Sequence, residues 1–157
     1  MNIQERIEAL ETEFAGKIKA LKAEAQREDE FPQYGQWYWH ITSDAGIGMS
    51  SWGEFEFEKE QLSIGNIFRT REQAEFAVEK MKVEAELRKF SKAFEYGENC
   101  TEFYYDHDFG RIMFCTLTAS QTQGAIYFES REKAEEAVKS VGEDRIKKYI
   151  FGVEDYL

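Results

Sequence analysis

The fold is decided by FRTREQAEFAV at residues 68–78 and FESREKAEEAV at residues 128–138, two copies of one pattern at a constant spacing of 60 residues. The copies share the leading aromatic residue, a hydroxyl residue suited to a helix N-cap, and the Arg-Glu, Ala-Glu and Ala-Val pairs. So many matches in the same order indicate that the chain contains an internal repeat.

Short aromatic and β-branched runs precede each copy and predict β-hairpins. In the first half, strands are expected at 37–42, 47–52 and 64–68, followed by a helix from residue 70 to about residue 92. In the second half, Tyr104 and Tyr105 align with Tyr38 and Trp39, and a turn glycine recurs. The predicted fold is therefore α+β, with two β-β-β-α pseudo-repeats, antiparallel sheets and covering helices.

The N-terminal segment predicts one amphipathic helix. Its apolar stripe follows a 4-3-4-4-3 spacing, close to an 11-residue repeat, and consists of Ile3, Ile7, Leu10, Phe14, Ile18 and Leu21. A helix of this length needs a partner to cover the stripe, so homo-oligomerisation is the preferred interpretation. Packing of the stripe on the chain's own domain is the alternative.

Four segments follow from these patterns. They are a helical oligomerisation arm at 1–30, a linker at 31–35, a first repeat at 36–94, and a second repeat at 95–157 that ends in a short helix. The linker contains the only proline of the chain, next to a charge run that stops the preceding helix.

The 157 residues carry a net charge of −11, which argues against direct nucleic-acid binding and favours a basic partner. No apolar run is long enough to cross a membrane, and the N-terminus does not resemble a signal peptide. We therefore expect a cytoplasmic protein whose Cys100 and Cys115 remain thiols.

No sequence motif indicates an enzyme, a cofactor or a metal site. His40 lies in an aromatic strand, and a satisfied sheet histidine is expected there rather than a general base. His107 lies in Asp-His-Asp before Phe-Gly, a pattern more typical of a hairpin turn than of metal ligands. Glycine-rich phosphate loops and C-x-x-C pairs do not occur in the sequence.

Two acidic stretches could bind a basic surface. The candidate residues are Glu54, Glu56, Glu58, Glu95, Glu98, Glu102, Asp106 and Asp108. If residues 54–58 are extended, their carboxylates lie on one face about 6.6 Å apart, close to two steps of a nucleic-acid strand. Such a row could imitate a phosphate backbone. A solvated strand face that keeps the protein soluble is the alternative.

The chain also has more aromatic residues than one sheet face can bury. Candidates for stacking a flat ligand are Trp37, Trp39, Trp52, Tyr104, Tyr105 and Tyr127. A phosphate on that ligand would require gathered arginines, for which the candidates are Arg69, Arg71, Arg111 and Arg131. Packing in a core or an interface is the alternative for the aromatic residues.

The segments 65–75, 127–130 and 146–152 resemble small uncharacterised proteins of phages and prophages of Gram-positive bacteria. The likeness covers nearly the whole chain, including the helical leader. It implies a cytoplasmic, non-enzymatic inhibitor of a host defence protein in an infected or lysogenic bacterium, similar to an anti-CRISPR protein. An oligomeric sponge for a nucleotide immune signal and a virion assembly protein are the alternative hypotheses.

Overall fold

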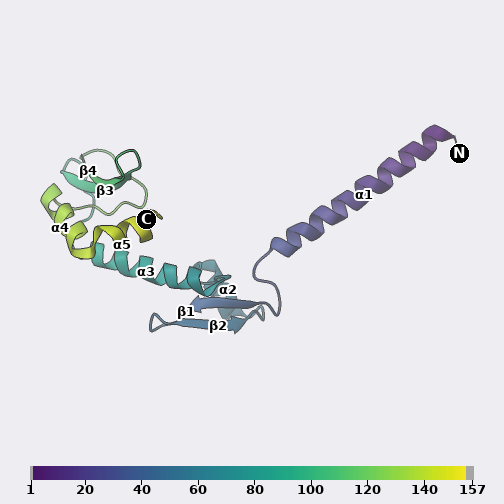
Figure 1. Ribbon diagram of the computed structural model, residues 1–157, viewed down its shortest axis with the longest axis horizontal. Coiled ribbons are helices and arrows are strands. Elements are labelled where there is room, and N and C mark those ends of the chain that lie inside the picture. The colour runs from purple at the N-terminus through teal and green to yellow at the C-terminus, as the bar shows by residue number, and fades with distance from the viewer. Residues whose placement is uncertain (1, 155–157) are drawn as a thin grey trace. The chain divides into compact units, whose positions relative to one another are not determined.

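The computed structural model describes residues 2–154 and has the predicted α+β composition (Figure 1). A long N-terminal helix precedes two antiparallel hairpins with helices and two short C-terminal helices. The elements are α1 (Ile3–Asp29), β1 (Trp37–Ile41), β2 (Ile47–Ser51), α2 (Glu56–Ser63), α3 (Arg71–Arg88), β3 (Cys100–Asp106), β4 (Arg111–Leu117), α4 (Arg131–Val141) and α5 (Glu143–Tyr149).

The chain divides into two compact units. The N-terminal unit comprises Met1–Thr42 and Gly48–Thr70, and the C-terminal unit comprises Ser43–Ile47 and Arg71–Leu157. Helix α3 thus belongs to the C-terminal unit, whereas the sequence had suggested that it closes the first repeat. None of the helices within residues 2–154 is long and apolar enough to cross a membrane.

Helix α1 begins with a reciprocal capping box. The Glu5 amide donates to Asn2 Oδ1 and the Asn2 amide donates to Glu5 Oε2, both at 2.8 Å. These bonds occupy backbone donors that have no partner inside the helix. The sequence prediction of one uninterrupted helix is confirmed for Ile3–Asp29 (Figure 1).

In the N-terminal unit, β1 and β2 form a two-stranded sheet, and the expected third strand at 64–68 is wrong. Ile64 caps the C-terminus of α2, a helix that the sequence analysis did not predict. Phe68 forms a bridge to the hairpin, in which Trp39 and Phe68 exchange two backbone hydrogen bonds, at 2.9 and 2.8 Å. The Asn66 side chain also accepts the Ile41 amide at 2.7 Å and donates to the Ile41 carbonyl at 2.9 Å.

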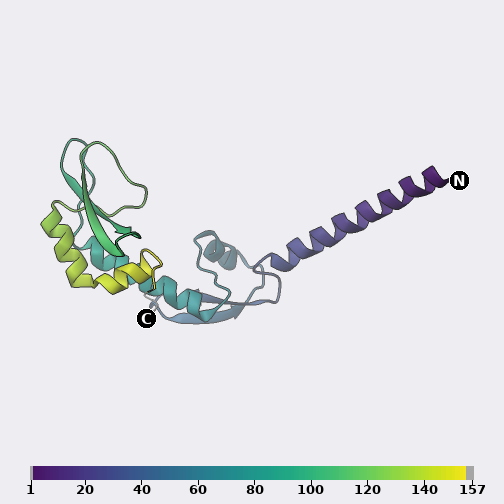
Figure 2. The same ribbon diagram turned by 45° about the horizontal axis from the view of Figure 1, so that its top comes forward.

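In the C-terminal unit, β3 and β4 pair in register from Cys100–Leu117 to Asp106–Arg111. The hairpin contacts α4, and α4 contacts both α3 and α5 (Figures 1 and 2). Phe128 lies at the centre of this core and is fully buried. The core residues around it are Val83, Leu87, Ile112, Ala134, Ala137, Val138, Val141 and Ile146.

The C-terminal unit also has a bridge where the sequence predicts a third strand. Thr101 and Phe128 exchange two backbone hydrogen bonds, at 2.9 and 2.7 Å, as Trp39 and Phe68 do. The bridges therefore place Trp39 in correspondence with Thr101. The alignment of Tyr38 and Trp39 with Tyr104 and Tyr105 is wrong, because similarity between aromatic residues does not fix strand register.

The helices after the two bridges start alike. Arg71 pairs with Glu75 at 2.7 Å in α3, and Arg131 pairs with Glu135 at 2.8 Å in α4. Ser130 caps α4 by accepting the Lys133 amide, as its position in the motif predicts. Helix α3 ends at Arg88, four residues before the expected end.

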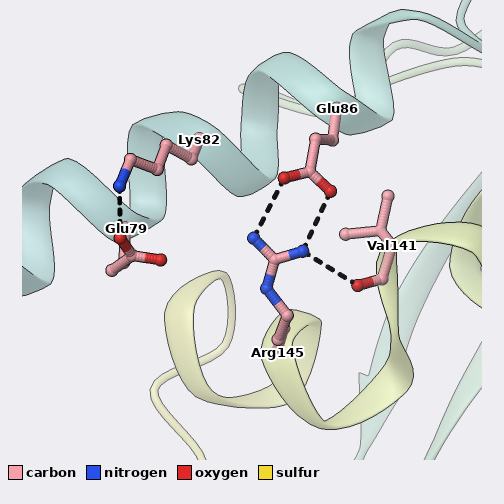
Figure 3. A network of polar contacts seen from close by, with 5 residues as sticks. All are labelled: Glu79, Lys82, Glu86, Val141 and Arg145. Atoms are coloured by element: carbon pink, nitrogen blue, oxygen red, sulfur yellow. Dashed lines mark hydrogen bonds and ion pairs between the residues drawn. The ribbon is translucent and has the colours of Figure 1, made fainter.

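One bidentate ion pair joins α3 to α5 (Figure 3). The Arg145 guanidinium donates to both carboxylate oxygens of Glu86, at 2.9 and 3.0 Å, and also to the Val141 carbonyl at 3.1 Å. The hydrogen bonds from Arg145 hold the pKa of Glu86 below its ordinary value of 4.5. This pair links the two helices at a partly exposed position.

We expect Arg145→Gln to lower the free energy of unfolding at pH 7. Because the folded-state pKa of Glu86 is depressed, the contribution of the pair is complete above the ordinary pKa and disappears as the pH falls through the folded-state value. Urea unfolding followed by circular dichroism should therefore show a difference from the wild type that narrows below about pH 4. A difference that is unchanged at pH 3 contradicts this role of Glu86.

Candidate interaction surface

The predicted row of extended carboxylates at 54–58 is not present, because Glu56–Ser63 forms α2. Phe55 is the N-cap residue, and Glu54 has a φ of +60°. The three carboxylates therefore have different environments. Glu54 and Glu56 are exposed, whereas Glu58 is only 1% exposed.

Glu58 fixes the segment that leads into α2. Its Oε2 accepts the Gly53 and Phe55 amides at 2.8 and 3.0 Å, and its Oε1 accepts the Tyr38 hydroxyl at 3.1 Å. The carboxylate thus connects β1, the loop after β2 and the first turn of α2. Glu58 is a structural residue, so it cannot meet a partner as the sequence analysis proposed.

The buried carboxylate and the neighbouring phenol perturb each other. Burial raises the pKa of Glu58, but the hydrogen bonds from Phe55, Gly53 and Tyr38 outweigh it and hold the pKa below the ordinary value of 4.5. Burial and the Glu58 carboxylate together raise the pKa of Tyr38. Glu58 is therefore charged and Tyr38 is neutral at pH 7.

Two aromatic rings are exposed on the segment that the hydrogen bonds of Glu58 hold. Phe55 and Phe57 are 60% and 61% exposed and stack with ring centroids 5.8 Å apart and planes 7° apart. A Cβ at residue 53 would lie 2.3 Å from the Phe55 ring, so Gly53 leaves the space in which that ring lies. We call the surface formed by Glu54, Phe55, Glu56, Phe57 and Glu60 the α2 surface.

The second acidic stretch is not one surface. Lys92 pairs with Glu98 at 3.1 Å, which lowers the pKa of Glu98. Asp106 accepts the amides of Asp108 and Phe109 within the β3–β4 turn. Glu95 and Glu98 precede β3, whereas Asp106 is its last residue and Asp108 comes after it. The strand separates the two groups by about 20 Å, the distance from Cys100 to Asp106 in an extended strand.

The candidate stacking residues are divided between the units. Trp52 and Tyr127 are buried, Trp39 and Tyr105 are partly buried, and Trp37 and Tyr104 are exposed. Tyr127 donates its hydroxyl to the Thr122 carbonyl and packs against Phe94, with ring centroids 5.2 Å apart. These contacts favour core packing, the alternative interpretation, for the buried members of the set.

The four candidate arginines have separate environments. Arg71 and Arg131 pair with glutamates on their own helices. Arg69 lies 4.9 Å from the centre of the Phe31 ring, and Arg111 lies 5.4 Å from that of Phe109. These contacts do not bring the four arginines together at one site.

The C-terminal unit has a pocket of about 250 Å³ beside β3. Its lining includes Arg88, Glu102, Phe103, Tyr104 and Phe151. Glu102 Oε1 accepts the Thr122 hydroxyl at 2.9 Å, while the buried Oε2 has no hydrogen-bond partner among residues 2–154. The pocket is slightly smaller than typical ligand sites.

One of the two histidines has an environment that differs from the sequence prediction. His107 lies in the β3–β4 turn, as predicted, and its ring contacts Tyr105 at 4.9 Å. His40 is half-buried, but its Nδ1 has no partner in the described part of the chain, so it is not a fully satisfied sheet histidine.

Cys100 is buried, Cys115 is partly buried, and both are free thiols.

The stripe of α1 remains exposed along the helix. The exposed fractions of its six large apolar residues run from 43% for Ile7 to 76% for Ile3. Lys17 lies 5.9 Å from the Phe14 ring centre and pairs with Glu13 at 2.6 Å. The predicted stripe is therefore present on one helix face.

A scan of protein-family models and searches of curated proteins and of solved structures returned no match to this chain.

We expect Glu58→Ala to destabilise the N-terminal unit by about 3 kcal/mol, because three donors lose their acceptor in a buried site. Glu58→Gln keeps the shape and one acceptor oxygen and should cost about 1 kcal/mol. Urea unfolding followed by tryptophan fluorescence reports this unit, since all three tryptophans lie in it. Equal unfolding midpoints for Glu58→Ala and the wild type would contradict the anchoring role.

Proposed function

We propose that this chain is a non-enzymatic interaction protein that self-associates through α1 and binds a basic, partly apolar protein face through the α2 surface. The main support for the binding surface is that two exposed, stacked phenylalanines lie among three exposed glutamates. The segment that bears them is held by the buried Glu58. Rigid aromatic rings with flanking charge are typical of interface hot spots with complementary charge.

The charge of the chain supports a basic partner. At −11, the protein attracts basic surfaces over a distance, and the attraction weakens as salt screens it. A nucleic-acid-binding groove of a host defence protein has that character. We therefore keep the phage-encoded defence inhibitor, suggested by the family resemblance, as the biological setting of the proposal.

We also propose that the two halves are copies of one unit made of a hairpin, a bridge and a helix. Each half has a hairpin, a residue that makes a two-bond bridge to its first strand, and a helix that opens with an Arg–Glu pair. The first copy carries α2 between its hairpin and its bridge. The second copy has residues 118–126 without a helix at that place, so the proposed binding surface is specific to the first copy.

A second candidate function is sequestration of a small flat ligand in the pocket beside β3. The rings of Phe103 and Tyr104 in its lining favour a ligand that stacks. A small mass retained in a native mass spectrum of protein purified from an infected host would support it.

The α2 surface is tested with two double variants and a charge-matched control. Phe55→Ser/Phe57→Ser removes the rings, and Glu56→Lys/Glu60→Lys reverses two charges. Glu129→Lys/Glu132→Lys makes the same change in net charge at exposed positions in the C-terminal unit. The measurements are protection of an infecting phage from a CRISPR nuclease in cells and the Kd for the purified nuclease.

We expect both α2-surface variants to abolish protection and to weaken binding at least tenfold, with the control unchanged. Binding of the wild type should also weaken when salt rises from 50 to 300 mM, because exposed charges are screened over about one Debye length. Wild-type affinity in both α2-surface variants would refute the proposed surface. Absence of nuclease binding and of protection by the wild type would refute the nuclease as the target.

A further inference from the structure

The spacing of the apolar residues in the α1 stripe is the same toward both ends of the helix. Counted from Phe14, its neighbours lie four residues away at Leu10 and Ile18, and seven residues away at Ile7 and Leu21. Eleven residues away, Ile3 corresponds to the exposed Ala25. The spacing 4-3-4-4-3-4 is therefore symmetric about Phe14.

This symmetry has a geometric consequence. Two helices that run in opposite directions stay in register along their whole length only if their apolar positions are symmetric about a centre. With a two-fold axis at Phe14, the two Phe14 rings meet and each other layer joins a residue to its counterpart on the second helix. The stripe of α1 meets that condition from Ile3 to Ala25, about 33 Å.

The charges beside the stripe have the opposite symmetry, because positions equidistant from Ala15 carry opposite charges. The pairs are Arg6 with Glu24, Glu8 with Lys22, Glu11 with Lys19, and Glu13 with Lys17. All eight residues are exposed. In an antiparallel pair centred on Phe14, the two members of each charge pair lie two residues, about 3 Å, apart along the axis, within reach of these long side chains. Such flanking charges set helix orientation.

A parallel pair lacks this match. It aligns residues 2–14, which have four glutamates and one arginine, with the same acidic segment of the other copy. It also aligns residues 15–26, which have three lysines and one glutamate, with themselves. Like charges at these distances oppose association, so the charge pattern selects the antiparallel direction.

We infer that α1 binds a second copy of this chain as an antiparallel helix pair with its two-fold axis at Phe14. This inference deepens the proposed function and rests on its self-association through α1. Since the two helices run in opposite directions, the two copies of Glu30 leave the pair at opposite ends. The dimer is then a bivalent binder that carries one α2 surface for each copy.

Charge reversal tests the direction in the full-length protein. Glu8 and Lys22 lie about 21 Å apart in one helix, so they interact only across an antiparallel pair. Glu8→Lys alone and Lys22→Glu alone should each weaken the dimer about tenfold in sedimentation equilibrium, by replacing attraction with repulsion. The double variant Glu8→Lys/Lys22→Glu should restore the wild-type dissociation constant, because both partners are exchanged.

Cysteine crosslinking tests the register. Leu10→Cys and Ile18→Cys chains, carrying different mass tags, are mixed and oxidised in a thiol–disulfide buffer, with the unsubstituted chain as the background for Cys100 and Cys115. We expect the mixed Leu10→Cys/Ile18→Cys dimer to predominate over either self-pair. Residues 10 of the two copies lie about 12 Å apart along the axis in the inferred pair, too far for a disulfide.

The outcomes separate the inference from the proposed function. Predominant self-pairs establish a parallel dimer, and a double charge variant as weak as the single ones shows that Glu8 and Lys22 do not interact across the pair. Either result overturns the inference and leaves self-association standing. A monomer at every concentration overturns both, and a stripe packed on its own chain is then the explanation. A dimer unaffected by Leu10→Glu/Ile18→Glu overturns α1 as its interface.

Discussion

Each half of this protein depends on one residue that joins a hairpin to the segment before a helix. Phe68 and Phe128 each exchange two backbone hydrogen bonds with the first strand of the preceding hairpin. An isolated two-stranded hairpin is marginally stable in water, so this third contact is needed to position it. In the C-terminal unit the same residue, Phe128, is fully buried in the core. The repeated motif therefore specifies both backbone pairing and packing.

The sequence predicts the periodic elements well. The α1 stripe, both hairpins, α4 with its Ser130 cap and the final helix follow from spacing and turn chemistry, which are local properties. The third strands reduce to single bridges because their pairing depends on tertiary contacts. Helix α2 is missed since Glu54 to Glu58 alternates with phenylalanine, a pattern of period two that favours a strand.

The candidate site is predicted only in part for a related reason. Sequence identifies Glu54, Glu56 and Glu58 as one acidic group, but burial separates Glu58 from the others. That carboxylate accepts hydrogen bonds from Tyr38, Gly53 and Phe55. No local sequence pattern indicates that these three donors meet at one residue. The adjacent phenylalanines become surface residues as a result. A buried glutamate thus supports an exposed aromatic and acidic surface.

The two proposals complement each other physically. The body of the chain is strongly acidic, so two copies repel at long range, and an interface between them must overcome that repulsion locally. In helix α1 all three lysines lie in the C-terminal half, and four of the six glutamates lie in the N-terminal half. That separation makes antiparallel self-pairing attractive while the rest of the chain stays acidic toward a basic partner.

The most direct test of the account is the distance between spin labels at Gln4 of two full-length copies, measured by double electron–electron resonance in a Cys115→Ser background. An antiparallel pair centred on Phe14 separates the two positions by 20 residues along the axis, so we predict about 30 Å. A distance below about 20 Å, the range for a parallel pair in register with adjacent helix axes, or no dipolar coupling would contradict the account.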